Sequence, residues 1–223
     1  MLTLANLSKT YRVGEVETQA LDGISAEVQA GEFVAIMGPS GCGKSTLLNI
    51  LGCLDQPSGG SYRLMGEEVS TLGEAQLARV RRAHIGFVFQ SFNLINDLTV
   101  AENVEIALLY RRDRASRRAR IADVLQQVGL GHRAGHRPQQ LSGGQQQRVA
   151  IARALVSDPK VIFADEPTGN LDTANGEAVM SLLKGVWESG TTIVMVTHSP
   201  RHAAEAQRTI GMLDGRIVGE TPA

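Results

Sequence analysis

Short, continuous apolar runs are the clearest pattern in this chain. They cover Phe33 to Met37, Val161 to Ala164 and Thr192 to Val196. Strands that are buried on both faces have this character, and they are typical of parallel sheets covered by helices. The three runs therefore predict neighbouring strands of a mainly parallel sheet in an α/β fold.

Polar residues follow each predicted strand directly. A glycine-rich loop follows the first, Asp165 and Glu166 follow the second, and Thr197 and His198 follow the third. In open α/β sheets, ligands bind beyond the carboxyl ends of the strands. We therefore expect these three segments to form one site.

Helical periodicity marks the middle of the chain. Residues 95 to 140 are predicted to form a helical lobe with two amphipathic faces. The first face consists of Val100, Val104, Ala107 and Leu108, and the second of Ile121, Val124, Leu125 and Val128. A further helix is predicted over Gln145 to Val156. The N-terminal strands and Ser61 to Met65 are predicted to form a small antiparallel β region.

The predicted fold is an α/β phosphate-loop core with a mainly parallel sheet, a small antiparallel β subdomain and a helical subdomain. We expect a single domain over residues 1–223. Within it, residues 1–89 and 159–223 form the core with the β subdomain, and residues from about 90 to 158 form the helical subdomain.

The loop after the first predicted strand fits the phosphate-binding pattern G-x-x-x-x-G-K-[ST], in the required order of strand, loop and helix. Glycines let backbone N–H groups turn inward, and the following helix adds the positive end of its dipole. Lys44 is expected to reach the β and γ phosphates, Ser45 to bind Mg²⁺, and Thr46 to support the α phosphate. The expected nucleotide-binding residues of this loop are Gly38, Pro39, Ser40, Gly41, Cys42, Gly43, Lys44, Ser45 and Thr46.

The acidic pair has two interpretations. Asp165 has the position of the carboxylate that holds Mg²⁺ in phosphate-loop nucleotidases, and Glu166 can accept a proton from the attacking water. The alternative is a solvated turn or a helix cap. His198 is expected to contact the γ phosphate, with a buried core histidine as its alternative.

A second glycine-rich loop lies far downstream. Ser142, Gly143 and Gly144 lie at the start of the helix predicted over Gln145 to Val156. A serine cap with two exposed glycines builds another anion site. The alternative is a capped surface helix after a glycine-rich turn. One nucleotide does not need two such loops from one chain.

Composition narrows the function classes. The chain has 223 residues, 43% hydrophobic and 20% charged, as in ordinary globular proteins. A net charge of −1 argues against a nucleic-acid-binding surface, so we expect no nucleic-acid partner. Cys42 and Cys53 lie too close in sequence for a disulfide framework, which favours a reducing cytosol. No stretch approaches the roughly 20 apolar residues of a membrane helix, and Met1 leads directly into a strand pattern. We therefore expect neither a membrane span nor export.

The motifs together resemble the ATPase subunits of ABC transporters, from Leu2 to about Gly219. Beside the phosphate loop, LSGGQ at Leu141 to Gln145 resembles the family signature. VIFADE at Val161 to Glu166 resembles the acidic strand of the family.

Further residues carry the same resemblance. Gln90 resembles the Q-loop glutamine, Gly169 to Asp172 the D-loop, and His198 the switch histidine. Tyr11 resembles the aromatic residue that stacks on adenine, with an edge-strand aromatic as the alternative.

This resemblance implies ATP hydrolysis by two copies packed head to tail, with the signature loop of one copy closing over the ATP of the other. The implied catalytic residues are Glu166, His198, Lys44 and Gln90. The implied Mg²⁺ ligands are Ser45, Gln90 and Asp165. The residues implied to reach the ATP of the opposite subunit are Ser142, Gly143, Gly144, Gln145 and Asp172.

Longer phrases such as GFVFQSFNLI and DEPTGNLD resemble the branch of macrolide exporters and lipoprotein-releasing ATPases. This branch implies an integral membrane permease, a periplasmic or extracytoplasmic component, and a peripheral location at the cytoplasmic face of the bacterial inner membrane. The permease is expected on a separate chain, with a chain in which it is fused to this ATPase as the alternative. A regulatory ATPase of a cell-division membrane complex is an alternative. A soluble ABC ATPase of DNA repair or translation is another.

Six arginines and one aspartate lie within residues 111–120. Such a run predicts a solvated helix face. Contact with anionic lipid headgroups is the alternative.

Overall fold

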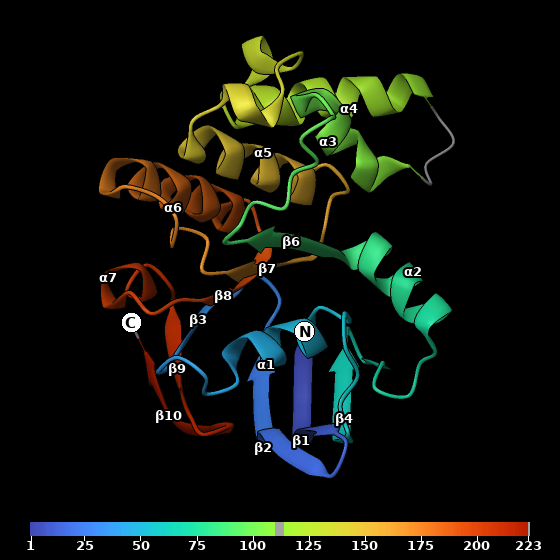
Figure 1. Ribbon diagram of the computed structural model, residues 1–223, viewed down its shortest axis with the longest axis vertical. Helices are drawn as coiled ribbons and strands as arrows, with labels where there is room; N and C mark the ends of the chain where they lie inside the picture. The colour runs from blue at the N-terminus through green and yellow to red at the C-terminus, as the bar shows by residue number, and fades with distance from the viewer. Residues whose placement is uncertain (110–113, 223) are drawn as a thin grey trace.

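A central sheet of six strands runs through the molecule in the order β10-β9-β3-β8-β7-β6 (Figure 1). The structure is a computed structural model that describes residues 1–109 and 114–222. Neighbouring strands from β9 to β6 are parallel, while β10 runs antiparallel to β9. The strands are β3 (Phe33–Met37), β6 (Ile85–Phe89), β7 (Val161–Asp165), β8 (Thr192–Val196), β9 (Arg208–Leu213) and β10 (Arg216–Pro222). The three apolar runs are therefore neighbouring strands, as predicted.

Alternate residues of these strands enter two separate hydrophobic cores. Phe33, Ala35, Ile162 and Ala164 belong to one core, whereas Val34, Ile36, Val161 and Phe163 belong to the other. Successive side chains of a strand point to opposite faces, so the sheet is buried on both sides. This explains why the strands are continuous apolar runs.

The first core lies between the sheet and helices. These helices are α3 (Val100–Glu105), α4 (Arg114–Gln127), α5 (Gly143–Leu155) and α6 (Thr173–Glu188), and Figure 1 shows them together on one side of the sheet. The predicted buried positions Val100, Val104 and Leu108 are fully buried, while Ala107 is half-buried. The helical pattern does not continue unbroken, because α3 ends at Glu105 and a 3-10 turn covers Ile106–Leu108.

The second core lies between the sheet and an antiparallel sheet of order β2-β1-β4-β5. Its strands are β1 (Leu2–Val13), β2 (Val16–Val28), β4 (Gly59–Leu64) and β5 (Glu67–Glu68). The predicted antiparallel region is therefore present. The shorter helices are α1 (Lys44–Leu51), α2 (Glu74–His84) and α7 (Pro200–Ala203), with 3-10 turns at Gly131–Arg133 and Pro138–Gln140.

The arginine-rich segment lies partly outside the described residues, which resume at 114. On α4, Arg117 pairs with Glu105 at 3.5 Å, and Arg120 Nε donates to the carbonyl of Val156 at 2.9 Å. These two side chains bind within the protein, so the prediction of a solvated helix face is wrong for them. Both side chains reach from α4 to residues of neighbouring elements.

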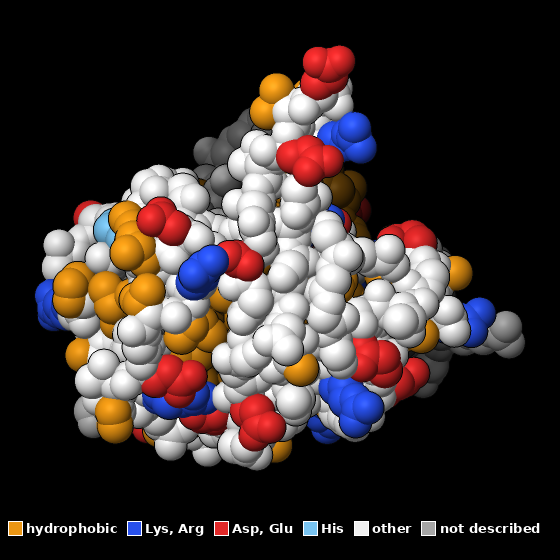
Figure 2. Space-filling view, turned by 90° about the horizontal axis from the view of Figure 1, so that it is seen from below, with side chains coloured by type: hydrophobic (Ala, Val, Ile, Leu, Met, Phe, Trp, Pro, Cys, Tyr) orange, Lys and Arg blue, Asp and Glu red, His pale blue; other side chains and the backbone are white. Residues whose placement is uncertain are grey.

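Helices long and apolar enough to cross a membrane are absent from the part of the chain that the structure describes. The lower face of the molecule mixes basic and acidic side chains without a continuous basic stripe (Figure 2).

Truncating a central core ring tests the two-core arrangement. Phe163 is 0% exposed, and its ring centroid lies 5.8 Å from that of Phe87. We expect Phe163→Ala to lower the free energy of unfolding by about 3–5 kcal/mol, measured by urea denaturation, because it leaves a cavity. Val218→Ala, at a position 64% exposed on β10, is the control and should change it by less than about 0.5 kcal/mol. Equal losses for the two variants would contradict the arrangement.

Candidate functional site

The carboxyl ends of β3, β7 and β8 meet at one cavity of about 520 Å³. Polar residues from all three strand ends line it, which confirms that they form one site. The lining residues are Thr18, Gln19, Ala20, Ser40, Gly41, Gly43, Lys44, Ser45, Thr46, Gln90, Glu166, Val196 and His198. Tyr11, Gly38, Pro39, Cys42 and Asp165 were also expected at the site, but they do not line the cavity, and Cys42 is only 3% exposed.

Glycine is required at the two ends of the phosphate loop. A Cβ on Gly38 would lie 2.2 Å from the carbonyl oxygen of Met212. Gly43 caps α1 with a φ of 99°, and a Cβ there would lie 2.5 Å from the carbonyl oxygen of Ala20. The loop can therefore pack tightly under the cavity while α1 starts at Lys44 and directs its N–H groups toward it.

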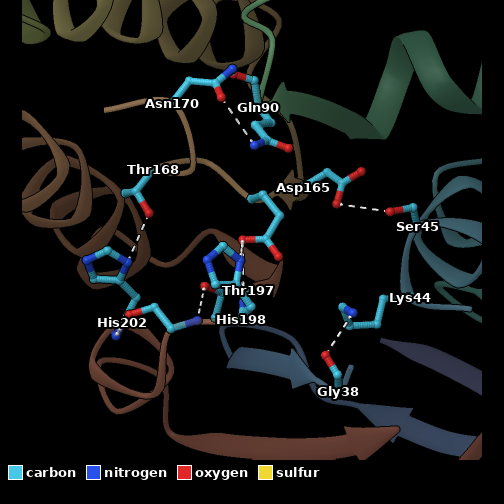
Figure 3. Close-up of polar contacts among 12 residues, drawn as sticks. Gly38, Lys44, Ser45, Gln90, Asp165, Thr168, Asn170, Thr197, His198 and His202 are labelled. Atoms are coloured by element: carbon cyan, nitrogen blue, oxygen red, sulfur yellow. Dashed lines mark hydrogen bonds and ion pairs between the residues drawn. The ribbon is translucent and has the colours of Figure 1, made fainter. Parts of the chain in front are cut away.

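Lys44 brings a buried ammonium group to this loop. Its Nζ donates to the carbonyl of Gly38 at 2.9 Å (Figure 3). It also donates to the carbonyl of Pro39 at 2.8 Å. An ammonium held by the carbonyls of this loop provides a positive centre for a polyphosphate.

Ser45 lines the cavity and contacts Asp165 beside it. Ser45 Oγ donates to Asp165 Oδ1 at 3.3 Å (Figure 3). Burial raises the pKa of the Asp165 carboxyl, and the Glu166 charge raises it further, while Ser45 and Lys44 act in the opposite direction. The two side chains thus present two oxygens to the same space, as predicted from their positions in the sequence.

The His198 ring and the Glu166 carboxyl are in polar contact, with Nδ1 to Oε2 at 2.8 Å. The side chain of Glu166 is 16% exposed and that of His198 is 71% exposed. His198 is therefore not a core histidine. Glu166 has a φ of 45°, in the left-handed region that is unfavourable for non-glycine residues. Its N–H donates to the carbonyl of Val196 at 3.0 Å, which helps to hold this backbone conformation.

Gln90 lines the cavity but is paired with the D-loop. Its Nε2 donates to Asn170 Oδ1 at 3.3 Å, and Asn170 Nδ2 donates to the carbonyl of Gln90 at 3.0 Å (Figure 3). A Cβ on Gly169 would lie 2.6 Å from Gln90 Nε2, so a larger residue there would displace the Gln90 side chain. No hydrogen bond in the described part of the chain joins Gln90 to Ser45 or Asp165.

The signature loop (Leu141 to Gln145) does not line the cavity. Ser142 caps α5, its Oγ accepting from the N–H of Gln145, and Gln145 Oε1 accepts in return from the N–H of Ser142. The helix begins at Gly143, two residues before the predicted start.

The prediction of two exposed glycines is wrong for Gly144. This residue is buried, and a Cβ on it would lie 2.1 Å from Asn175 Oδ1. A Cβ on Gly143 would lie 3.5 Å from Leu171. The signature loop therefore packs against the D-loop and the start of α6 in the same chain.

Asp172 caps α6. Its Oδ1 accepts from the N–H of Asn175 at 2.9 Å, and its Oδ2 accepts from Asn175 Nδ2 at 2.6 Å. Hydrogen bonds from Asn175 lower the pKa of the Asp172 carboxyl. The carboxylate thus has a structural role within its own chain, and its contact with the nucleotide of another subunit stays a prediction.

Tyr11 lies beside the phosphate loop. Its hydroxyl donates to Asp55 Oδ2 at 2.8 Å, and Lys9 Nζ lies 4.8 Å from the ring centroid. Burial and then Asp55 raise the pKa of Tyr11, whereas a hydrogen bond with Thr46 lowers it. The ring is thus held next to Thr46, and stacking on adenine stays a prediction.

The comparisons with known proteins decide the family. The family model described as ABC transporter matches residues 21–169. An uncharacterized ABC transporter ATP-binding protein of Thermotoga maritima is 54% identical over 98% of this chain and 94% of its own length. The chain belongs to the ABC transporter family.

Two other similarities add detail. The macrolide export ATP-binding/permease protein MacB 1/2 of Paracoccus denitrificans is 52% identical over 99% of this chain and 33% of its own length. The chain therefore spans about a third of this relative. The cassette MJ0796, solved as a dimer in a post-hydrolysis state with ADP and phosphate, has a TM-score of 0.92 and 47% identity, over 100% of this chain and 98% of that chain. The fold is that of an ABC cassette, and the chain is an ATPase of this family.

Some residues at the site of this ABC ATPase were not predicted from the sequence. Thr18, Gln19 and Ala20 line the cavity from β2, and nothing in their pattern distinguishes them. Gln147 is fully buried beneath the site. It shares a helix face with Ile151 and Ala154, and a polar residue on an apolar helix face could have indicated a buried functional side chain.

Removing the Asp165 charge tests its environment. The raised pKa means that the native state holds the proton more tightly than the unfolded chain, whose ordinary value is 3.8. Ionisation of Asp165 therefore lowers the free energy of unfolding. This destabilisation is absent below pH 3.8, grows as the pH rises above that value, and is complete above the native pKa. We expect Asp165→Asn to raise the melting temperature more at pH 7 than at pH 4. Asp97→Asn, at an exposed position, is the control and should show no such difference. A pH-independent shift for Asp165→Asn would contradict the expectation.

Proposed function

We propose that this chain hydrolyses ATP as one half of a head-to-tail pair, and that the pair powers a separate membrane permease of the exporter or lipoprotein-releasing type. One observation carries the proposal: the chain has two glycine-rich loops that each lead into a helix, and of these two only the phosphate loop lines the cavity within the described residues. The signature loop is left for the nucleotide of another copy.

The first half of the site binds the nucleotide. Lys44 and the amides of residues 38–46 neutralise the phosphates, and Thr46 supports the α phosphate. Tyr11 stacks on adenine from its position beside Thr46. The MJ0796 cassette, which was solved with bound ADP and phosphate, supports this assignment through its similar fold.

The residues present fit a Mg²⁺ ion. Ser45 Oγ and Asp165 Oδ1 lie 3.3 Å apart, near the separation of about 2.9 Å between adjacent ligands of octahedral Mg²⁺. Gln90, from the same cavity, is the third proposed ligand. When bound, the ion neutralises charge on the β and γ phosphates.

Glu166 is the proposed base. Its carboxylate accepts the proton of the attacking water, and its contact with His198 fixes its direction. The exposed His198 ring is then placed to steady the γ phosphate. Gln90, which also lines the cavity, orients the water.

A second copy completes the site. Ser142, Gly143, Gly144 and Gln145 present the start of α5, with Asp172 nearby, to the γ phosphate held by the partner. Phosphoryl transfer depends mainly on positioning and electrostatics, so closing the pair assembles the transition-state site. Two dimeric structures of MJ0796 support this arrangement.

A groove of about 780 Å³ supports a membrane partner. Phe87, Phe89 and Ile106 provide apolar walls, and four arginines, at positions 79, 81, 82 and 153, line it too. We assign it to an apolar, acidic cytoplasmic segment of the permease, because this charge pattern complements it. The MacB relative carries ATP-binding and permease parts in one longer chain, which supports the assignment. The chain would then lie at the cytoplasmic face of the bacterial inner membrane.

The base assignment is tested by Glu166→Gln. We expect unchanged ATP binding, a turnover about 10²- to 10⁴-fold lower, and accumulation of an ATP-bound dimer, because the amide cannot accept the proton. Phosphate release and size-exclusion chromatography with ATP measure these outcomes. Glu177→Gln, half-exposed on α6, should behave as the wild type. Turnover near the wild-type rate in Glu166→Gln would remove Glu166 as the base.

The groove is tested by Ala78→Glu on α2. This exposed position lines the groove, and a carboxylate there would repel an acidic segment. We expect unchanged ATPase activity of the isolated chain and at least about a ten-fold loss of membrane protein co-purified in detergent. Ala119→Glu, exposed on α4 outside the groove, is the matched control. Undiminished co-purification with Ala78→Glu would exclude this docking site.

A further inference from the structure

Gln147 on α5 carries a fully buried amide to which the proposed function gives no role. Its side chain is 0% exposed. Nε2 donates to the carbonyl of Pro167 at 2.6 Å and to that of Phe89 at 3.3 Å. Both protons of one amide nitrogen are therefore used on two separate backbone segments.

These two segments carry reacting groups. Phe89 is the last residue of β6 and directly precedes Gln90, while Pro167 directly follows Glu166. Phe89 also pairs with Asp165 in the parallel register of β6 and β7. One amide from α5 thus links the backbone that leads into Gln90 with the backbone that leaves Glu166.

Packing alone does not explain this amide. Gln147 Oε1 is buried and has no hydrogen-bond partner among the described residues. If the amide were flipped, Oε1 would face two carbonyl oxygens, which cannot donate a hydrogen bond to it. The NH₂ group therefore has to face these carbonyls. An apolar side chain would fill the space and remove the unpaired Oε1, but the carbonyls of Pro167 and Phe89 would lose this donor.

The same helix begins at the signature loop. Gly144 in its first turn packs against Asn175, and a Cβ on Gly86 of β6 would lie 2.9 Å from the carbonyl oxygen of Ala154 near its other end. Arg153 of α5 also donates to the carbonyl of Phe92, beyond Gln90, at 2.7 Å. The helix is therefore closely fitted to β6 and holds the backbone on both sides of Gln90.

We propose that Gln147 is a positioning residue for hydrolysis. The signature loop at the start of α5 binds the nucleotide of a partner copy. The two carbonyl contacts of Gln147 transmit this binding to Gln90 and Glu166 of the same chain and set their positions. This inference rests on the proposed function, because it needs the second copy and the reacting roles of Gln90 and Glu166.

The test uses Gln147→Met in the full chain, because Met has a similar length and no N–H donor. We expect kcat for ATP to fall about ten- to a hundred-fold, since small misplacement of reacting groups has effects of this size. KM, and the Kd of a fluorescent ATP analogue, should change less than about two-fold, because the phosphate loop is untouched. Gln146→Met is the matched control, since the Gln146 amide donates to the carbonyl of Leu141 and not to the strand ends.

A double-mutant cycle separates positioning from loosened packing. If Gln147 acts through Gln90, the effect of Gln147→Met on kcat should largely disappear in a Gln90→Ala background. Gln147→Asn keeps the amide, but its shorter side chain cannot reach both carbonyls. If Gln147→Met does not fold, Gln147→Asn replaces it, and the same fall in kcat with a nearly unchanged KM is expected.

The outcomes distinguish the two proposals. A wild-type chain without ATPase activity would overturn the proposed function together with this inference. An active wild type with unchanged kcat in the folded Gln147 variants, or with fully additive effects in the cycle, would overturn this inference alone.

Discussion

Parallel hydrogen bonding between four strands is the constraint on which the site depends. In the register of the sheet, Phe89 pairs with Asp165, Asp165 with Val196, and Val196 with Ile36. The strands therefore end in one row, and the residues that follow them enter one cavity. Because side chains alternate across a strand, a slip of one residue would turn Asp165 away and break both cores. Burial on two faces makes such a slip very unfavourable.

The charged side chains beyond this row lie where burial limits their contact with water. Asp165 and Glu166 are adjacent carboxylates in a partly buried setting, and the pKa of Asp165 is raised as a result. The Lys44 ammonium lies opposite, held by carbonyls of its own loop. A bound cation and polyphosphate would complete this balance, so the site is suited to charged ligands and not to an apolar one.

Contacts within one chain also connect the parts that meet different nucleotides. The D-loop binds Gln90 through Asn170 on one side and contacts the signature glycines on the other. Gln147 adds a link from α5 to the strand ends. The cavity and the signature loop are thus separate surfaces joined by short, mostly polar contacts, which is how occupancy of one could influence the other.

The sequence by itself determined the elements and much of the site. Apolar runs defined β3, β7 and β8, because strands buried on both faces admit few polar residues, and the phosphate loop was recognisable because its chemistry is local in sequence. The division into subdomains and the roles of single residues stay predictions. Only the tertiary structure decided that Gly144 is buried, that Asp172 caps α6, that Arg117 faces Glu105, and that Gln147 links two strand ends. Each of these depends on a partner distant in sequence or on the local fold around it, so no simple pattern of residues encodes it.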